Sequence, residues 1–138
     1  MGDLREGDIL KESLYMSSIF EEFKEKYDLL NVVVNHETDV QVNLILILRL
    51  IDNLLANAYR VSQSATVEII DATVLIVNDG PTIPSSTLKK MNRGKQLQPH
   101  EYSGTGQGFI ICFEIMQLHN GKIHIESAHN QTKVTLVF

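Results

Sequence analysis

The chain has 138 residues, which is the usual size of one domain and enough to bury a substantial core. Its formal net charge of −5 argues against non-specific nucleic-acid binding, because no surplus of cations is available to displace counterions from phosphates. The single cysteine, Cys112, excludes an internal disulfide.

The sequence gives no sign of a membrane-associated domain. The first residues lack the basic start and apolar core of a signal peptide. The most apolar stretch, Val40 to Leu55, is too short and too polar to span a bilayer. We therefore expect a cytoplasmic domain without direct membrane contact, and leave open whether a longer parent protein is membrane-anchored.

In the first half of the chain, two helices and one strand are predicted. Helical spacing runs from about Asp8 to Tyr27, carried by Ile9, Leu10, Leu14, Ile19, Phe20 and Phe23. The β-branched run from Leu29 to Asn35 predicts a strand. A long apolar helix from about Asp39 to Val61 follows, with Asp39 as the expected N-cap.

The second half alternates short strands with helices. Two strands that pair through a tight turn are expected at Thr66–Asp71 and Thr73–Asn78. A short helix capped by Ser85 or Ser86 ends near Met91, and Asn92 to Gly106 reads as a loop of functional length. A helix (Gly108–His119) and two strands joined at His129-Asn130 complete the chain, Lys122–Ser127 and Lys133–Phe138. Five strands and three main helices predict a two-layer α/β sandwich with the helices on one sheet face.

Three polar segments are candidates for function, and the first lies on the long helix. Asn53, Asn57 and Arg60 are spaced so that they project from one helical face. One interpretation is a polar seam that caps neighbouring loops. The other is that an asparagine oxygen ligates Mg²⁺, which prefers oxygen donors, while Arg60 contacts phosphate.

The second segment runs from Val77 to Pro84, at the end of a strand. A polar side chain there can accept a hydrogen bond from an adenine amino group, and Gly80 lets the backbone approach a flat ring closely. Because Asp79-Gly80-Pro81 is also favourable turn chemistry, a simple turn is the alternative.

The third segment, Ser103 to Phe109, opens the helix that ends at His119. Glycines at alternate positions, Gly104, Gly106 and Gly108, let successive N–H groups converge on an anion, and the helix start adds a favourable dipole. The spacing fits neither a Walker loop nor a dinucleotide fingerprint. By itself the pattern is weak support for phosphate binding.

Taken in order, the three segments resemble the GHKL superfamily of ATP-binding domains, and within it the catalytic domains of bacterial sensor histidine kinases. Asp52 to Arg60 looks like the N box, Asn78 to Pro84 like the G1 box and Gly104 to Gly108 like the G2 box. Ile111 to Ile123 is similar to the family's exit from helix to strand. The resemblance covers roughly residues 31–138 and implies the Bergerat fold, with a mixed sheet of about five strands.

The resemblance also implies a function: transfer of the γ-phosphate of ATP to a histidine on a separate module. Asn57 would ligate Mg²⁺, with Asn53 beside it and Arg60 near the phosphates. The remaining nucleotide contacts would come from Asn78, Asp79, Gly80, Ile83, Gly104, Thr105, Gly106, Gln107 and Gly108. Residues 92–103 would be the ATP lid, with Arg93 or Lys95 as cationic helpers; ordinary solvated lysine and arginine is the alternative.

The same resemblance predicts the partners and the domain boundary. Residues 1–28 would form a helix that connects to a dimerisation and phosphoacceptor module, and residues 29–138 the ATP-binding catalytic domain. A response regulator is the further partner. None of the five histidines lies in a sequence like the family's phosphoacceptor helix, so we read all of them as non-acceptors: His36, His100, His119, His124 and His129.

Two other functions stay open, one because of departures from the family pattern and one because another class of kinase shares the fold. Asn78 stands where the family has an aspartate, with Asp79 one residue later; Thr82 replaces the second G1 glycine, and Gln107 a common leucine. One alternative is a degenerate regulatory domain with weak or no ATP binding. The other is a protein-serine kinase of the anti-sigma-factor type. Asn53 stands where ATP-hydrolysing relatives carry a glutamate, and an amide cannot act as a general base.

Overall fold

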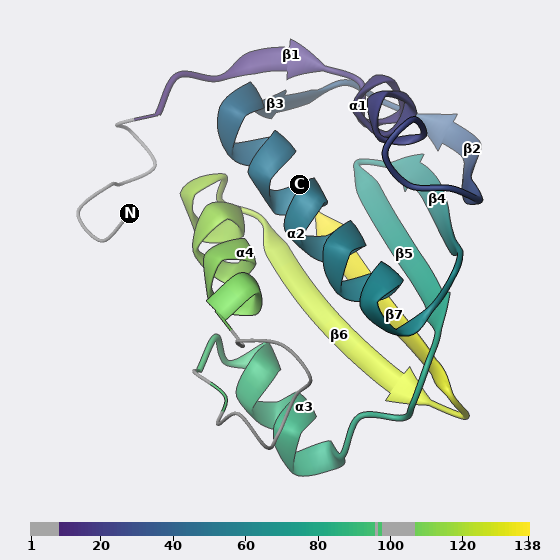
Figure 1. Ribbon diagram of the computed structural model, residues 1–138. Helices are drawn as coiled ribbons and strands as arrows, with labels where there is room; N and C mark the ends of the chain where they lie inside the picture. Colours follow the sequence, from purple (N-terminus) through teal and green to yellow (C-terminus); the bar gives the residue numbers. More distant parts are fainter. Residues whose placement is uncertain (1–8, 96, 98–106) are drawn as a thin grey trace.

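The computed structural model describes residues 9–95, 97 and 107–138. Its elements, in chain order, are β1 (Glu12–Leu14), α1 (Met16–Phe23), β2 (Leu30–Glu37), β3 (Val40–Val42), α2 (Leu44–Val61), β4 (Ala65–Asp71), β5 (Thr73–Asp79), α3 (Ser85–Asn92), α4 (Gln107–Leu118), β6 (Lys122–Ala128) and β7 (Gln131–Val137). Helices α1, α2 and α4 cover one face of the main sheet, and α3 lies beside β6 (Figure 1). The predicted two-layer α/β sandwich is confirmed.

The main sheet has five strands in the order β2-β4-β5-β7-β6. β2 and β4 run parallel, since α2 connects them across the sheet face, and the other neighbours are antiparallel. A bulge between Val34 and His36 interrupts the β2–β4 register. The predicted strand pair Thr66–Asp71 and Thr73–Asn78 and the turn at His129-Asn130 are both found, each within one residue or two of the expected bounds.

Helix α2 is positioned by the periodic apolar pattern of its sequence. Its buried side chains recur every three or four residues, so that one stripe faces the sheet and α4: Ile47, Leu50, Ile51, Leu54, Leu55 and Ala58. The polar N-box residues lie on the remaining surface. The buried stripe therefore fixes which way the polar face of α2 points.

The predicted start of this helix was wrong. Asp39 does not cap it; Asn43 is the N-cap, and its side-chain oxygen accepts from the N–H of Leu46 at 3.0 Å. Residues 40–42 instead form β3, which pairs antiparallel with β1. Asp39 accepts a hydrogen bond from the hydroxyl of Ser13.

The predicted Asp8–Tyr27 helix was also wrong at both ends, with Asp8 outside the described residues. Glu12 to Leu14 are extended because β3 supplies their hydrogen-bond partners, and α1 covers only Met16 to Phe23. The carboxylate of Glu37 accepts from the N–H of Ser17 at 2.8 Å, which satisfies one of the free donors at the start of α1. The buried side chains of α1, such as Phe20, belong to the same core cluster as those of α2.

Two smaller differences concern α3. Ser85 and Ser86 do not cap it, because Pro84 occupies the N-cap position and Ser85 is already helical. Asn92, expected in the loop, ends α3, and its carboxamide bonds both the N–H (2.7 Å) and the carbonyl (2.9 Å) of Ile125. These bonds attach α3 to β6.

His119 joins the end of α4 to the start of α2. Its Nε2 accepts from the backbone N–H of Asn43 at 3.0 Å, while its Nδ1 donates to the carbonyl of Ile115 at 2.7 Å. This arrangement requires a neutral imidazole. Burial lowers the pKa of His119, which keeps the ring neutral.

Candidate functional site

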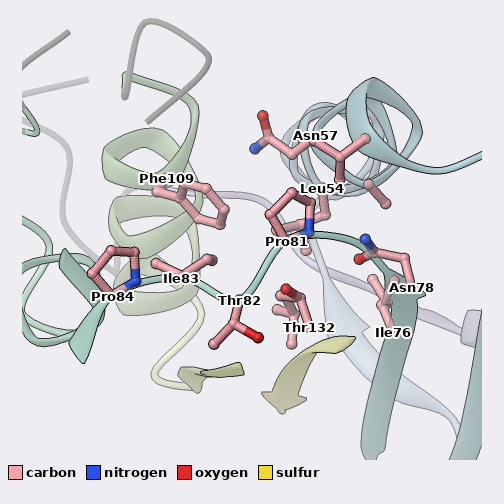
Figure 2. Close-up of a pocket in the computed structure, with 13 residues that line it drawn as sticks. Leu54, Asn57, Ile76, Asn78, Pro81, Thr82, Ile83, Pro84, Phe109 and Thr132 are labelled. Atoms are coloured by element: carbon pink, nitrogen blue, oxygen red, sulfur yellow. The ribbon is translucent and has the colours of Figure 1, made fainter. Parts of the chain in front are cut away.

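A pocket of about 220 Å³ lies between α2, the loop after β5 and the start of α4 (Figure 2). Sites that enclose a whole drug-sized ligand measure about 300–1,000 Å³. The pocket therefore fits one part of a larger ligand, such as a single heteroaromatic ring system. Its described lining comprises Leu54, Asn57, Ala58, Val61, Ile76, Asn78, Pro81, Thr82, Ile83, Pro84, Phe109, Thr132 and Val134.

Most of this lining is apolar, and its parts come from four elements far apart in the sequence. Leu54 and Ala58 project from α2, Ile76 from β5, Phe109 from α4 and Val134 from β7. An apolar pocket with a few polar groups at defined places is the usual composition of a small-molecule site. The lining favours a flat apolar ring that carries a hydrogen-bonding edge.

Asn78 is the buried polar group of the pocket. It is 7% exposed, and its Nδ2 donates to the carbonyl of Asp79 at 3.0 Å. This bond orients the carboxamide so that its oxygen remains the acceptor for a ligand donor. Asp79 is exposed and lies outside the pocket lining, because neighbouring residues of β5 face opposite ways. Of the two candidates at this strand end, Asn78 faces the pocket.

The start of α4 lies beside the N-box asparagine. A Cβ atom placed on Gly108 would be 3.5 Å from Nδ2 of Asn57, so the first turn of α4 lies against the C-terminal half of α2. A helix start favours an anion, because the aligned peptide dipoles leave partial positive charge there. On the same helix, Nη1 of Arg60 donates to Oδ1 of Asn57 at 2.9 Å. An amide oxygen, a guanidinium and a helix start together suit a phosphate group and its metal ion.

These residues fit Mg²⁺ only if phosphate oxygens of the bound ligand and water complete its coordination shell. Mg²⁺ commonly takes one or two protein oxygens and completes its shell with water and phosphate oxygens. Asn57 offers one such oxygen, which at present accepts from Arg60. The guanidinium would have to share or release that oxygen when a metal binds.

The other predicted residues are placed as follows. Ile83 lines the pocket, whereas Asn53, Arg60, Gly80, Arg93 and Lys95 lie outside its described lining. Arg93 and Lys95 are exposed residues just beyond the C-terminal end of α3. Gly104, Thr105 and Gly106 lie outside the described residues, and Gln107 is the first residue of α4.

Gly80 has a reason to be glycine that the sequence did not reveal. A Cβ atom there would be 2.9 Å from Cγ2 of Val61, closer than real Cβ contacts come. The loop after β5 thus passes directly over the last turn of α2. In this structure, glycine at position 80 permits the contact with Val61.

Sequence reasoning missed Thr132 and did not single out Phe109. Thr132 pairs with Asn78 across β5 and β7 and reaches the pocket from β7. The signal that could have identified it was the strand register, because Thr132 is the residue directly opposite Asn78. Phe109 follows the third glycine of the G2-like segment and is 6% exposed.

Known proteins resemble the chain in sequence and in fold. Residues 42–138 match the family described as histidine kinase-, DNA gyrase B-, and HSP90-like ATPase. The sensor protein BasS of Salmonella typhimurium is 30% identical over 89 residues, which cover 60% of this chain and 25% of BasS. The chain thus spans about a quarter of the length of this curated relative.

Two solved structures share the fold at lower identity. The mycobacterial sensor histidine kinase MprB has a TM-score of 0.67 at 22% identity, over 93% of this chain and 96% of that one. The cytoplasmic segment of histidine kinase QseC has a TM-score of 0.67 at 15% identity, over 93% and 73%. Within the described residues, no helix is long and apolar enough to cross a membrane.

The predicted superfamily is confirmed by the sequence match, which spans more than half of the chain and includes both α2 and the loop after β5. The fold agrees with it, and the pocket lies where the N-box-like helix, the G1-like loop and the G2-like helix meet. The chain therefore belongs to the family of histidine kinase-, DNA gyrase B- and HSP90-like ATPases.

Proposed function

We propose that this chain is the ATP-binding catalytic domain of a sensor histidine kinase, which transfers the γ-phosphate of ATP to a histidine on a separate module. One observation carries the proposal: three separated segments meet at one pocket, with Asn57, Asn78 and Phe109 all in its lining. The relative BasS is a sensor protein, and MprB and QseC are histidine kinases.

The residues divide between base and phosphates. The oxygen of Asn78 accepts from the amino group of the base, whose ring lies against apolar side chains such as Phe109 and Ile83. Asn57 holds Mg²⁺, and Arg60 contacts phosphate. The metal, when bound, neutralises phosphate charge. Asn53 cannot take a proton from water, so this domain turns over ATP slowly in the absence of an acceptor.

Further proposals concern the glycine-rich segment and the rest of the parent protein. Gly104, Thr105 and Gly106 hold phosphates together with the start of α4, and Arg93 or Lys95 assists. Residues 1–28 connect to the dimerisation and phosphoacceptor module, on the same parent chain or a separate protein, while residues 29–138 bind ATP. A response regulator receives the phosphate, and the domain works in the cytoplasm.

Binding experiments test the site directly. Titration calorimetry with ATP, with and without Mg²⁺, should give sub-millimolar affinity that requires the metal. Asn57→Ala should remove most of the metal dependence. Arg60→Ala should weaken ATP by about tenfold, as expected for losing a charged hydrogen bond, yet leave adenosine unchanged because adenosine has no phosphates. Exposed Asn31 provides a matched control, Asn31→Ala.

A transfer assay separates this proposal from the two alternatives. The domain is incubated with labelled ATP and candidate acceptor modules, and the products are treated with acid. Label lost in acid identifies phosphohistidine, whereas acid-stable label identifies the serine-kinase alternative. If the wild-type domain binds no ATP at millimolar concentration with Mg²⁺, the degenerate regulatory domain replaces both.

A further inference from the structure

The loop after β5, which forms one wall of the pocket, is hydrogen-bonded to the turn between β6 and β7. The N–H of Gly80 donates to the carbonyl of Asn130 at 3.0 Å, and the N–H of Asn130 donates back to Oγ1 of Thr82 at 2.8 Å. The Thr82 hydroxyl also lies 3.5 Å from Oδ1 of Asn130, a longer and weaker contact. Loop and turn therefore exchange hydrogen bonds in both directions.

The next residue of the loop, Ile83, is also hydrogen-bonded to the hairpin. The N–H of Ile83 donates to Oγ of Ser127 at 2.8 Å, and the hydroxyl of Thr132 reaches the same oxygen at 3.4 Å. Thr82, Ile83 and Thr132 line the pocket, whereas Ser127 lies outside its described lining. Two consecutive wall residues are thus held by the β6–β7 hairpin.

The β6–β7 hairpin holds the hydrogen-bonding groups of Asn130 in a defined position, because its turn is only two residues long. His129 and Asn130 both adopt left-handed backbone conformations, with φ of 52° and 57°. Two such residues between paired strands form the tight turn whose twist matches the strands, and asparagine tolerates this conformation well. Ala128 and Gln131 close the hairpin on either side. The position of the Asn130 backbone is therefore set by the sheet.

We propose that Thr82 is a positioning residue, which holds the 80–83 segment in the shape that receives the base of the nucleotide. The proposal rests on the function proposed above. In the G1 box of the family that the chain resembles, the position of Thr82 carries a glycine, which has no hydroxyl to accept a hydrogen bond from Asn130. Thr82 supplies that acceptor, so the wall is ordered before the ligand arrives and less freedom is lost on binding.

Three substitutions at one position test this. Thr82→Val keeps the shape and removes the hydroxyl, Thr82→Gly restores the family residue, and Thr82→Ser keeps the hydroxyl. Binding of adenosine and of Mg²⁺–ATP is measured by calorimetry, and thermal unfolding is followed in parallel. Thr135→Val is the matched control, because Thr135 lies on the opposite face of β7 from Thr132 and Val134.

Thr82→Val and Thr82→Gly should weaken adenosine and ATP by the same factor, about three- to tenfold, as expected for losing one or two hydrogen bonds. Thr82→Ser should stay within about twofold of wild type. If Thr82→Val and Thr82→Gly bind adenosine as the wild type does, the positioning role is refuted while the proposed function stands. If the wild type binds no nucleotide, both are refuted. If Thr82→Val does not fold, the comparison of adenosine binding by Thr82→Gly and Thr82→Ser decides whether the hydroxyl positions the loop.

Discussion

Replacing His119 by alanine should destabilise the domain, and the loss should depend on pH. His119 is 7% exposed and joins two helices: Nε2 accepts from the N–H of Asn43, the N-cap of α2, and Nδ1 donates to Ile115. The substitution removes two hydrogen bonds of about 1 kcal/mol each and leaves the partly buried N–H of Asn43 without its acceptor. We expect a loss of about 2–3 kcal/mol in the free energy of unfolding at pH 7.5.

The pH dependence follows from the lowered pKa of the folded imidazole. Above about pH 6.5, the ordinary histidine value, folded and unfolded states are both neutral and the full contribution of His119 is present. Below it, the unfolded state takes up a proton first, so the wild type loses stability until the folded imidazole is protonated as well. A protonated Nε2 would then face the Asn43 N–H, donor against donor.

Urea denaturation of wild type and His119→Ala at several values between pH 8 and pH 5 measures the difference. For a domain of this size, the loss at pH 7.5 corresponds to a fall in melting temperature of roughly 8–12 °C. The gap between the two proteins should narrow as the pH falls. Exposed His124 provides the control, His124→Ala. A gap that is the same at every pH would refute the neutral-acceptor role of His119.

Three further experiments test other parts of the structure. Asn43→Ala removes the N-cap of α2 and should lower the free energy of unfolding, measured by urea denaturation, by about 1 kcal/mol. Asp39→Ala should cost less, because Asp39, the N-cap expected from the sequence, does not cap the helix; equal losses would contradict the assignment of Asn43. Gly80→Ala should weaken ATP binding because of the 2.9 Å contact with Val61, and adding Val61→Ala should restore much of it; a double-mutant cycle without coupling would argue against the contact. Burial raises the pKa of Cys112 to about 12, so iodoacetamide should label it at pH 8 only after unfolding; rapid labelling of the native protein would show that the thiol is accessible.

How well the sequence predicted the fold depended on whether the deciding contacts were local. Helix α2 was found because its buried stripe repeats over many turns, a signal contained in neighbouring residues. Its start was misplaced because Val40-Gln41-Val42 continues the apolar run, and only the pairing with β1, from residues 12–14, makes it a strand. The same distant pairing explains why Glu12 to Leu14 are not helical. Local periodicity carries no information about such partners.

The sequence predicted those residues of the candidate site that lie in local motifs. The order of the Asn57, Asn78 and Gly108 segments predicted one nucleotide pocket. Asn57 and Asn78 line a common pocket, and Gly108 lies beside Asn57. Thr132 and the hydrogen bond from Asn130 to Thr82 could not be found in the same way, because both depend on the register of β7 against β5 and β6. Local sequence motifs do not fix a strand register.

The bulge in β2 affects how the domain behaves when many copies are crowded together. Among the described strands, β2 lies at an edge of the sheet, so one side of its backbone has no neighbouring strand there, next to the exposed side chains of Val33 and Val34. A flat, apolar edge strand can pair with a strand from a neighbouring molecule and so start aggregation. Because the register breaks between Val34 and His36, a second straight strand cannot match the full length of this edge. We therefore expect the bulge to disfavour self-association at the edge of the sheet opposite β6.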